Sequence, residues 1–559
     1  MINFPPGLIL LFGAFLLPFI RGRGRDALVL ILPLLTLAAI WMVPDGASVS
    51  AQFLDYTLTP VRATPVGRLF ATVFAIMAFA GGLYALRQAR VMEMVAAFAY
   101  AGSAIGVTFA GDLITLFVFW ELMSVGSTVV LWSAGTRGAY RASMRYLMVH
   151  LMGGVLLMFG IIGHIGATGS VAFEPMQADS LANWLILIGF LINAGAPPLS
   201  AWVADAYPEA SPSGAVFLSA FTTKTAVFAL LVAFPGTWVL IPVGLYMAFY
   251  GIIYALLEND MRRVLAYSIV NQVGFMVIGI GIGTELALNG AAAHAFAHII
   301  YKGLLLMSAG SVLYQTGERR LSHLGGLFRT MPVTAFLGII GALAISAFPF
   351  TSGFVSKSMV TSSAAEQHMT LVWLLMQAAA AGVFLHAGIK FPWFVFFQKD
   401  SGLRPAEPPA NMRIAMWVFA FFCIALGVYP APLYNLLPFP VDYAPYTAGH
   451  LVASFQLLLF AGLAFFVMLP LMKRTLTITL DFDWFYRHFG ALVGSEMMVR
   501  ASQARRRSAV AAQLSAQRFF VGLDRYHGPT SKFASTWPTG SMVLWVAILL
   551  GAYLVFGFL

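Results

Sequence analysis

The sequence is poor in cysteine, in charge and in lysine. Its 559 residues include one cysteine, Cys423, which can neither form an intrachain disulfide nor ligate an iron–sulfur cluster by itself. Only 10% of the residues are charged, whereas a soluble domain carries about 25%. These shortages exclude a soluble enzyme, a disordered chain and a disulfide-stabilised secreted domain.

Apolar residues are abundant instead. They make up 60% of the chain, and the mean hydropathy is +0.85. A transmembrane helix needs about 20 mainly apolar residues, so the sequence predicts an all-α, polytopic membrane protein with about 14–16 transmembrane helices. Sixteen apolar runs are candidates: 5–20, 27–43, 69–86, 92–110, 113–133, 146–165, 183–203, 214–234, 239–257, 264–283, 290–314, 332–363, 370–397, 414–435, 450–472 and 541–559.

Arginine is concentrated in every second loop between these runs. The loops after the odd-numbered runs are basic, whereas the loops after the even-numbered runs are mainly acidic. Representative residues are Arg23, Arg87, Arg137, Arg263, Arg319 and Lys473 with Arg474 for the basic loops, and Asp45, Glu174, Glu285 and Asp442 for the acidic loops. The positive-inside rule then predicts a multi-pass protein of the bacterial inner (cell) membrane with both termini outside. The net charge of +10 is thus a topology signal, and no nucleic-acid partner is predicted.

One long basic segment, about 473–540, precedes the last run. Its stretch Met497–Gln517 predicts a basic, weakly amphipathic helix of about twenty residues, or some 30 Å. It is either a surface helix held by anionic lipid headgroups or a lateral brace that contacts a partner subunit.

Lysine appears where arginine does not. All seven lysines follow residue 223: Lys224, Lys302, Lys357, Lys390, Lys399, Lys473 and Lys532. Lys224, Lys302 and Lys357 fall inside apolar runs, as does Glu121. An ionisable side chain at this depth is costly and indicates function, and a desolvated lysine, unlike arginine, can release its proton. A plain ion pair between two helices is the simpler interpretation of Glu121.

Histidines accompany the lysines at helical spacing. His294, His298 and Lys302 recur every four residues and share one helix face, and His386 and Lys390 repeat the spacing. Glutamate, histidine and lysine together suit a proton relay. Lys390, near the end of its run, could instead extend to the interface. No metal site is predicted, because the histidines have no carboxylate or cysteine nearby.

Two proline-containing breaks indicate an internal repeat. The segment from Asn193 to Trp202 ends the seventh run, and the segment from Ser346 to Phe354 interrupts the twelfth. Breaks five runs apart predict two inverted five-helix repeats with broken helices. The predicted organisation is N-terminal helices at 1–90, a first repeat at 91–283, a second repeat at 284–435, and C-terminal helices with the basic segment at 436–559.

Five motifs carry a family resemblance: Phe117–Ser124, Pro198–Ala206, Glu258–Ser268, His294–Leu305 and Ser352–Lys357. With them, residues 65–435 resemble the antiporter-like subunits shared by Mrp-type multi-subunit cation/proton antiporters and respiratory complex I, the proton-conducting NADH:quinone oxidoreductase. The D subunit of the Mrp systems is the most similar. The resemblance implies a relay made of Glu121, Lys224, His294, His298, Lys302 and Lys357. Asn193, His386 and Lys390 are the accessory candidates.

The chain departs from the family pattern at position 193. The resemblance implies a lysine five residues before Pro198, where this sequence has Asn193, and a histidine where it has Ser200. Asparagine cannot carry a proton at neutral pH. Either Lys224 partners Glu121 instead, or the first half moves another ion, or that half is passive; Asn193 could also serve burial alone.

The predicted function is a membrane subunit of a multi-subunit monovalent cation/proton antiporter, with Na⁺ as the first candidate cation. Other membrane subunits and anionic lipid are its predicted partners, and no cofactor is predicted. Three alternatives are a proton-pumping subunit of a complex I-like or membrane hydrogenase complex, whose redox chemistry would reside in partner subunits, a proton-driven subunit for inorganic-carbon uptake, and a structural subunit without transport.

Overall fold

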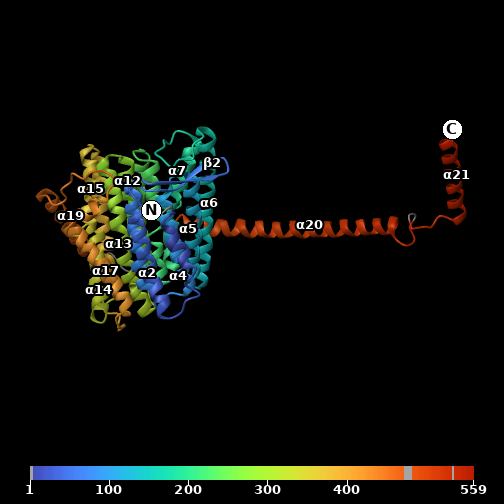
Figure 1. The fold of residues 1–559 in the computed structure, drawn as a ribbon. Coiled ribbons are helices and arrows are strands. Elements are labelled where there is room, and N and C mark those ends of the chain that lie inside the picture. Colours follow the sequence, from blue (N-terminus) through green and yellow to red (C-terminus); the bar gives the residue numbers. More distant parts are fainter. Residues whose placement is uncertain (1–3, 471–480, 532–533, 559) are drawn as a thin grey trace. The chain divides into compact units, whose positions relative to one another are not determined.

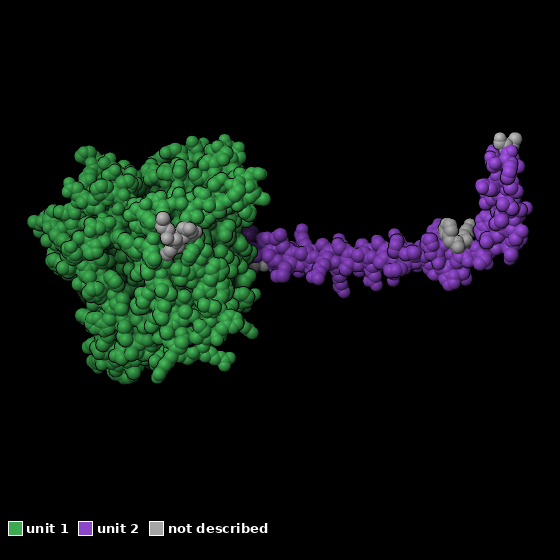
Figure 2. Space-filling view, in the orientation of Figure 1, with its two compact units in different colours: residues 1–483 green, residues 484–559 purple. Residues whose placement is uncertain are grey.

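The computed structural model describes residues 4–470, 481–531 and 534–558. Lys473, Arg474 and Lys532 lie outside the described residues. The chain forms two compact units, Met1–Asp483 and Trp484–Leu559, which Figure 2 distinguishes by colour. The candidate site lies within the first unit.

Helices that could cross a membrane dominate both units. Thirteen such stretches occur among the described residues. They are α2 (Arg23–Met42), α3 (Pro65–Ala85), α4 (Val91–Phe109), α5 (Leu113–Trp132), α6 (Arg137–Thr168), α9 with α10 (Pro212–Ala233), α11 (Leu240–Leu257), α12 (Met261–Ile282), α13 (Glu285–Thr316), the stretch Thr370–Phe397, α17 (Ala410–Val428), α19 (Ala448–Met468) and α21 (Thr539–Phe558). Two shorter apolar helices, α7 (Leu181–Ala194) and α14 (Pro332–Ile345), complete the set.

The predicted all-α, polytopic fold is therefore confirmed. Fifteen of the sixteen predicted runs correspond to these helices. The first run, 5–20, contains only the eight-residue α1 (Gly7–Ala14), which is too short to span a bilayer.

Several helices are broken inside the bundle. α7 is followed by α8 (Ala201–Ala206), and α14 by α15 (Ser352–Glu366), which places breaks at the two predicted positions. A third break, which the sequence did not predict, separates α9 (Pro212–Leu218) from α10 (Thr222–Ala233). Beyond α16 (Thr370–Val383) the chain winds into the π-helical turns Phe384–Lys390 and Trp393–Phe397. Such irregular backbone often marks functional positions.

Helix ends follow ordinary capping chemistry. The side chains of Thr64, Asp112 and Thr284 accept backbone N–H groups in the first turns of α3, α5 and α13. α6 and α13 end at Gly169 and Gly317, whose φ angles of 73° and 68° a residue with a side chain rarely adopts. These signals set the lengths of the helices that carry the site.

Helix α13 occupies the middle of the first unit (Figure 1). It is 32 residues long and packs against α3, α9, α12, α14, α15 and α17. Residues 287–312 of α13 are all buried. Polar groups on this helix therefore have protein, and not lipid, around them.

The loops gather on two opposite sides, as the alternation of runs predicts. On the arginine-rich side Arg319 pairs with Asp260 at 2.9 Å and with Glu209 at 3.0 Å. On the other side Arg62 pairs with Glu174 at 3.6 Å. That side also carries an antiparallel hairpin of β1 (Ser48–Phe53) and β2 (Tyr56–Arg62), which the sequence did not predict.

Gly353 permits the close approach at the break between α14 and α15. A Cβ atom at this position would overlap the carbonyl oxygen of Ala344. We expect Gly353→Ala to lower the free energy of unfolding by about 1–3 kcal/mol, as overpacked cores do, and thermal unfolding of the purified protein measures the change. Gly449→Ala is the matched control, because nothing lies within 4 Å of its added Cβ. Equal unfolding temperatures for the two variants would contradict the tight break.

The second unit contains α20 (Gly490–His527) and α21. α20 has 38 residues and is about 57 Å long, so the predicted helix of about twenty residues was too short. None of its described side chains is buried, and Arg500, Arg505, Arg506 and Arg507 are exposed along it.

Candidate functional site

Lys224 lies at the unpredicted break between α9 and α10. Its side chain is fully buried, and its Nζ donates to the carbonyl of Ser219 at 2.6 Å and to Thr223 Oγ1 at 3.0 Å. The Ser219 carbonyl is available because the helix is interrupted there. The break thus supplies the acceptor that a buried ammonium group needs.

Glu121 and Asn193 face the same part of α6. A Cβ atom at Gly154 would overlap Oε1 of Glu121, and a Cβ atom at Gly153 would lie 3.7 Å from Oδ1 of Asn193. Among the described residues, Glu121 Oε1 and both polar atoms of the Asn193 amide have no hydrogen-bond partner. Buried polar atoms seldom remain unpaired, so this junction of α5, α6 and α7 has unused capacity for water or protons.

His294 is the centre of a hydrogen-bonded group in the second half. Its Nδ1 lies 3.1 Å from Ser356 Oγ on α15, and its Nε2 lies 3.1 Å from Gln272 Oε1 on α12. Tyr301 donates to the same Gln272 oxygen at 3.1 Å. Three helices are linked through one imidazole in this way.

His298 and Lys302 continue the row along α13. Both are fully buried. The His298 ring lies 5.2 Å from the Tyr301 ring, and neither of its nitrogens has a partner among the described residues. Lys302 Nζ donates to Ser268 Oγ at 2.9 Å. The four-residue spacing therefore places all three side chains inside the bundle.

Lys357 lies just after the second predicted break. Its Nζ donates to the carbonyl of Ile345, the last residue of α14, at 3.1 Å. The same nitrogen lies 4.9 Å from the centre of the Phe275 ring, a cation–π distance. Lys224 and Lys357 thus share one arrangement, in which a carbonyl released by a helix break accepts from a buried lysine.

His386 and Lys390 occupy the π-helical turn. His386 Nδ1 lies 2.8 Å from the carbonyl of Gly382, and its Nε2 has no partner in the described part of the chain. Lys390 Nζ donates to the carbonyls of Ala255, Leu256 and Glu258, at 3.0, 2.7 and 2.6 Å. Lys390 therefore satisfies carbonyl groups at the C-terminal end of α11, a structural role that does not require proton transfer.

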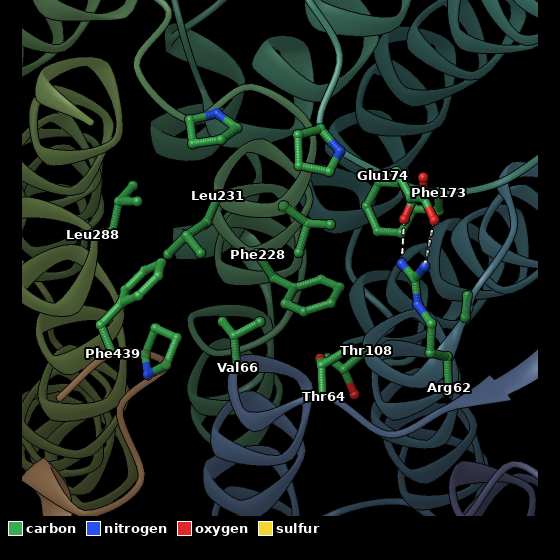
Figure 3. Close-up of a pocket in the computed structure, with 15 residues that line it drawn as sticks. Arg62, Thr64, Val66, Thr108, Phe173, Glu174, Phe228, Leu231, Leu288 and Phe439 are labelled. Atoms are coloured by element: carbon green, nitrogen blue, oxygen red, sulfur yellow. Dashed lines mark hydrogen bonds and ion pairs between the residues drawn. The ribbon is translucent and has the colours of Figure 1, made fainter. Parts of the chain in front are cut away.

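A cavity of about 420 Å³ approaches Lys224 from the side of the acidic loops. Figure 3 shows the Arg62–Glu174 pair at one end and Phe228, Leu231 and Phe439 along the apolar wall. Phe228 follows Lys224 by four residues on α10, one turn away. The cavity therefore reaches to within about one helical turn of the buried lysine.

Several polar residues of the site were not among the sequence candidates. Ser268, Gln272, Tyr301 and Ser356 bind the predicted lysine and histidine groups. His150 on α6 is 1% exposed and was also missed. Its mid-helix position was hidden because the apolar run began at 146, whereas α6 begins at Arg137.

Comparisons with known proteins identify relatives of this chain. A family model described as "NADH:quinone oxidoreductase/Mrp antiporter, TM" matches residues 110–382. The N subunit of the NADH-quinone oxidoreductase of Desulforudis audaxviator is 32% identical over 58% of this chain and 72% of that protein. The D subunit of the Na(+)/H(+) antiporter of Alkalihalophilus pseudofirmus is 31% identical over 52% of this chain and 65% of that protein.

This chain is also similar to part of a longer relative and to chains of two solved complexes. The A/B subunit of a probable K(+)/H(+) antiporter of Rhizobium meliloti is 30% identical over 65% of this chain, which spans only 39% of that protein. A chain of the Mrp complex from Dietzia sp. superposes with a TM-score of 0.78 at 22% identity, over 93% of this chain and 63% of that one. A chain of an archaeal membrane-bound sulfane sulfur reductase gives 0.72 at 22% identity, over 99% of both chains. At such identities the two structures show the fold alone.

Proposed function

Because this chain belongs to the family of membrane subunits shared by NADH:quinone oxidoreductases and Mrp antiporters, we propose that it is a membrane subunit of a multi-subunit monovalent cation/proton antiporter, with Na⁺ as the first candidate cation. Protons would move along Glu121, Lys224, His298, Lys302 and Lys357 and the His294 group. Other membrane subunits would complete the complex. The printed names of the Alkalihalophilus and Rhizobium relatives, which describe one Na⁺/H⁺ and one K⁺/H⁺ antiporter, support this proposal.

The burial of three lysines without carboxylate partners is the observation that carries the proposal. Lys224, Lys302 and Lys357 hydrogen-bond only to carbonyl and hydroxyl oxygens within the described residues. Neutral acceptors hold a lysine in place without neutralising its charge, so a charge held there permanently would be costly. A group that gains and loses a proton fits such a place, and arginine could not replace it.

The orientation follows from the arginine-rich loops. We propose that the side carrying Arg262 and Arg319 faces the cytoplasm of a bacterial inner membrane and that the C-terminus lies outside. The predicted outside N-terminus would require residues 5–20 to cross the membrane, for which α1 is too short. A reporter fusion at the C-terminus tests this orientation, and a cytoplasmic signal there contradicts it.

The test of the function uses the whole operon in an antiporter-deficient bacterium. In inverted vesicles we expect added Na⁺ to dissipate a preformed proton gradient, and we expect Glu121→Gln and Lys357→Met each to remove most of that response. Added K⁺ in a parallel assay identifies the coupling ion. Full activity of both variants, with normal membrane levels, would exclude the relay.

A second candidate is a proton-pumping subunit of a redox complex. The 72% coverage of the Desulforudis oxidoreductase relative favours it, as does a 26% identity with hydrogenase-4 component B of Escherichia coli. Purification from native membranes discriminates between the two. Co-purification of redox subunits, with no Na⁺-dependent or K⁺-dependent response in vesicles, would favour the redox complex.

A further inference from the structure

His150 on α6 has a buried proton-acceptor nitrogen without a hydrogen-bond partner among the described residues. Its Nδ1 lies 2.9 Å from the carbonyl of Tyr146. A carbonyl only accepts, so Nδ1 carries the hydrogen, and Nε2 of the neutral ring presents a lone pair. Nε2 is buried and has no partner among the described residues. The local backbone therefore fixes the tautomer that can accept a proton.

The Glu121 side chain contacts α6 about one helical turn beyond residue 150. Its Oε1 occupies the position of a Cβ atom at Gly154. Residues 150 and 154 are four apart on α6, so their Cβ positions are about 5–6 Å apart on one face. Both the carboxylate oxygen and the imidazole nitrogen lack protein partners among the described residues. The ring of His150 is turned toward Tyr146, so water molecules would bridge the carboxylate and the imidazole.

The opposite side of His150 leads to Lys224. The ring of His150 stacks on Tyr146, with centroids 3.9 Å apart. The Tyr146 hydroxyl lies 3.2 Å from Thr222 Oγ1, in the first turn of α10 that also carries Lys224. Trp202 covers the imidazole edge-on at 4.6 Å. The imidazole therefore lies between the carboxylate and the broken helix, inside a shell of aromatic rings.

Asn193 offers no alternative for proton transfer. Asn193 is on α7, and its side-chain amide packs against α6 near Gly153 and is fully buried. An amide can orient water, but it cannot take up a proton near neutral pH. Among residues 147–154 of α6, His150 is the side chain that can take up a proton near neutral pH.

We propose that His150 carries protons between Glu121 and Lys224 in the first half of the subunit, a role that rests on the proposed antiport function. The proton leaves the Glu121 carboxyl group and reaches Nε2, which gives a carboxylate and an imidazolium. It then leaves from Nε2 toward the neutral amine of Lys224 through water and the Thr222 hydroxyl. The Nδ1 hydrogen remains bonded to the Tyr146 carbonyl throughout.

The first experiment replaces His150 in the complete complex. We expect His150→Gln to lower proton-coupled transport in inverted vesicles about 100-fold while the complex assembles normally. If His150→Gln fails to assemble, His150→Asn is measured instead, because its smaller amide can keep the bond to Tyr146. His164→Gln is the matched control, since His164 lies on α6 but binds Asn183 at 2.8 Å.

A second experiment separates proton carriage from packing. We expect Asn193→Lys to restore transport in the His150→Gln background, because it places a titratable amine beside the same stretch of α6. If Asn193→Lys is active alone but does not rescue, His150 is a packing residue and the proposal is wrong. Wild-type transport by His150→Gln, with loss in Glu121→Gln, also overturns it and leaves the antiport function standing. Wild-type transport in both variants and in Lys357→Met rejects the antiport relay itself.

Discussion

Replacing Lys302 by methionine is expected to reduce proton-coupled transport about 100-fold, the lower end of what a positioned proton-transfer group contributes. Lys302 is fully buried in the middle of α13, and its ammonium donates to Ser268 Oγ at 2.9 Å. Methionine preserves the length and apolar contacts of the chain but cannot hold a proton. Because Lys302 is one member of a single proposed relay, no parallel route would compensate for its loss. Dissipation of the proton gradient in inverted vesicles measures the loss.

Two further variants distinguish the loss of a proton carrier from the loss of a positive charge at position 302. Lys302→Arg retains the positive charge but cannot release a proton, so we expect it to be as inactive as Lys302→Met. Lys399→Met removes a lysine from an exposed loop and should leave transport unchanged. An active Lys302→Arg variant, present at normal levels in the membrane, would show that the position needs only a fixed charge.

The main parts of the bundle could be predicted because they depend on local chemistry. Apolar runs of membrane-spanning length located fifteen of the helices, and Pro198 and Pro349 located two breaks, since proline removes a backbone donor. Four-residue spacing placed His294, His298 and Lys302 on one face, and the structure buries all three. These predictions needed no knowledge of distant contacts.

The break before Lys224 could not be predicted in this way. No proline or glycine occurs in Ser219–Phe221. The interruption is stabilised from outside, because the Thr222 amide donates to the Tyr100 hydroxyl at 2.9 Å, across 122 positions of sequence, and Lys224 donates to the carbonyl of Ser219. A single sequence gives no indication of such distant partners.

Helix ends were misplaced where basic residues extend a helix beyond its apolar part. α6 begins at Arg137, because the exposed Arg137 and Arg141 can extend their charged ends to the membrane surface while their backbone stays helical. The apolar run in the sequence covers only the part of α6 from residue 146 onward. His150 therefore resembled a residue at a helix end, although it lies more than three turns inside α6.

The same arginine-rich end of α6 carries an ion pair whose loss is expected to destabilise the first unit by about 3 kcal/mol. Arg145 Nε donates to Asp205 Oδ2 at 2.6 Å, and its Nη2 donates to Asp205 Oδ1 at 2.7 Å, which gives a bidentate link between α6 and α8. The Asp205 side chain is only 4% exposed. Asp205→Ala deprives a partly buried guanidinium of this partner, and removal of one member of a buried pair is costlier than loss of both.

Thermal unfolding of the purified protein in detergent measures this cost. Glu174→Ala is the matched control, because it removes an Arg62 pair whose carboxylate is 65% exposed, and such surface pairs contribute less than about 1 kcal/mol. The double variant Arg145→Ala with Asp205→Ala should be less destabilised than the sum of the two single variants, because neither charge is then left without the other. Strictly additive losses would mean that the two side chains stabilise α6 and α8 independently, and that the short α8 is held by its apolar contacts instead.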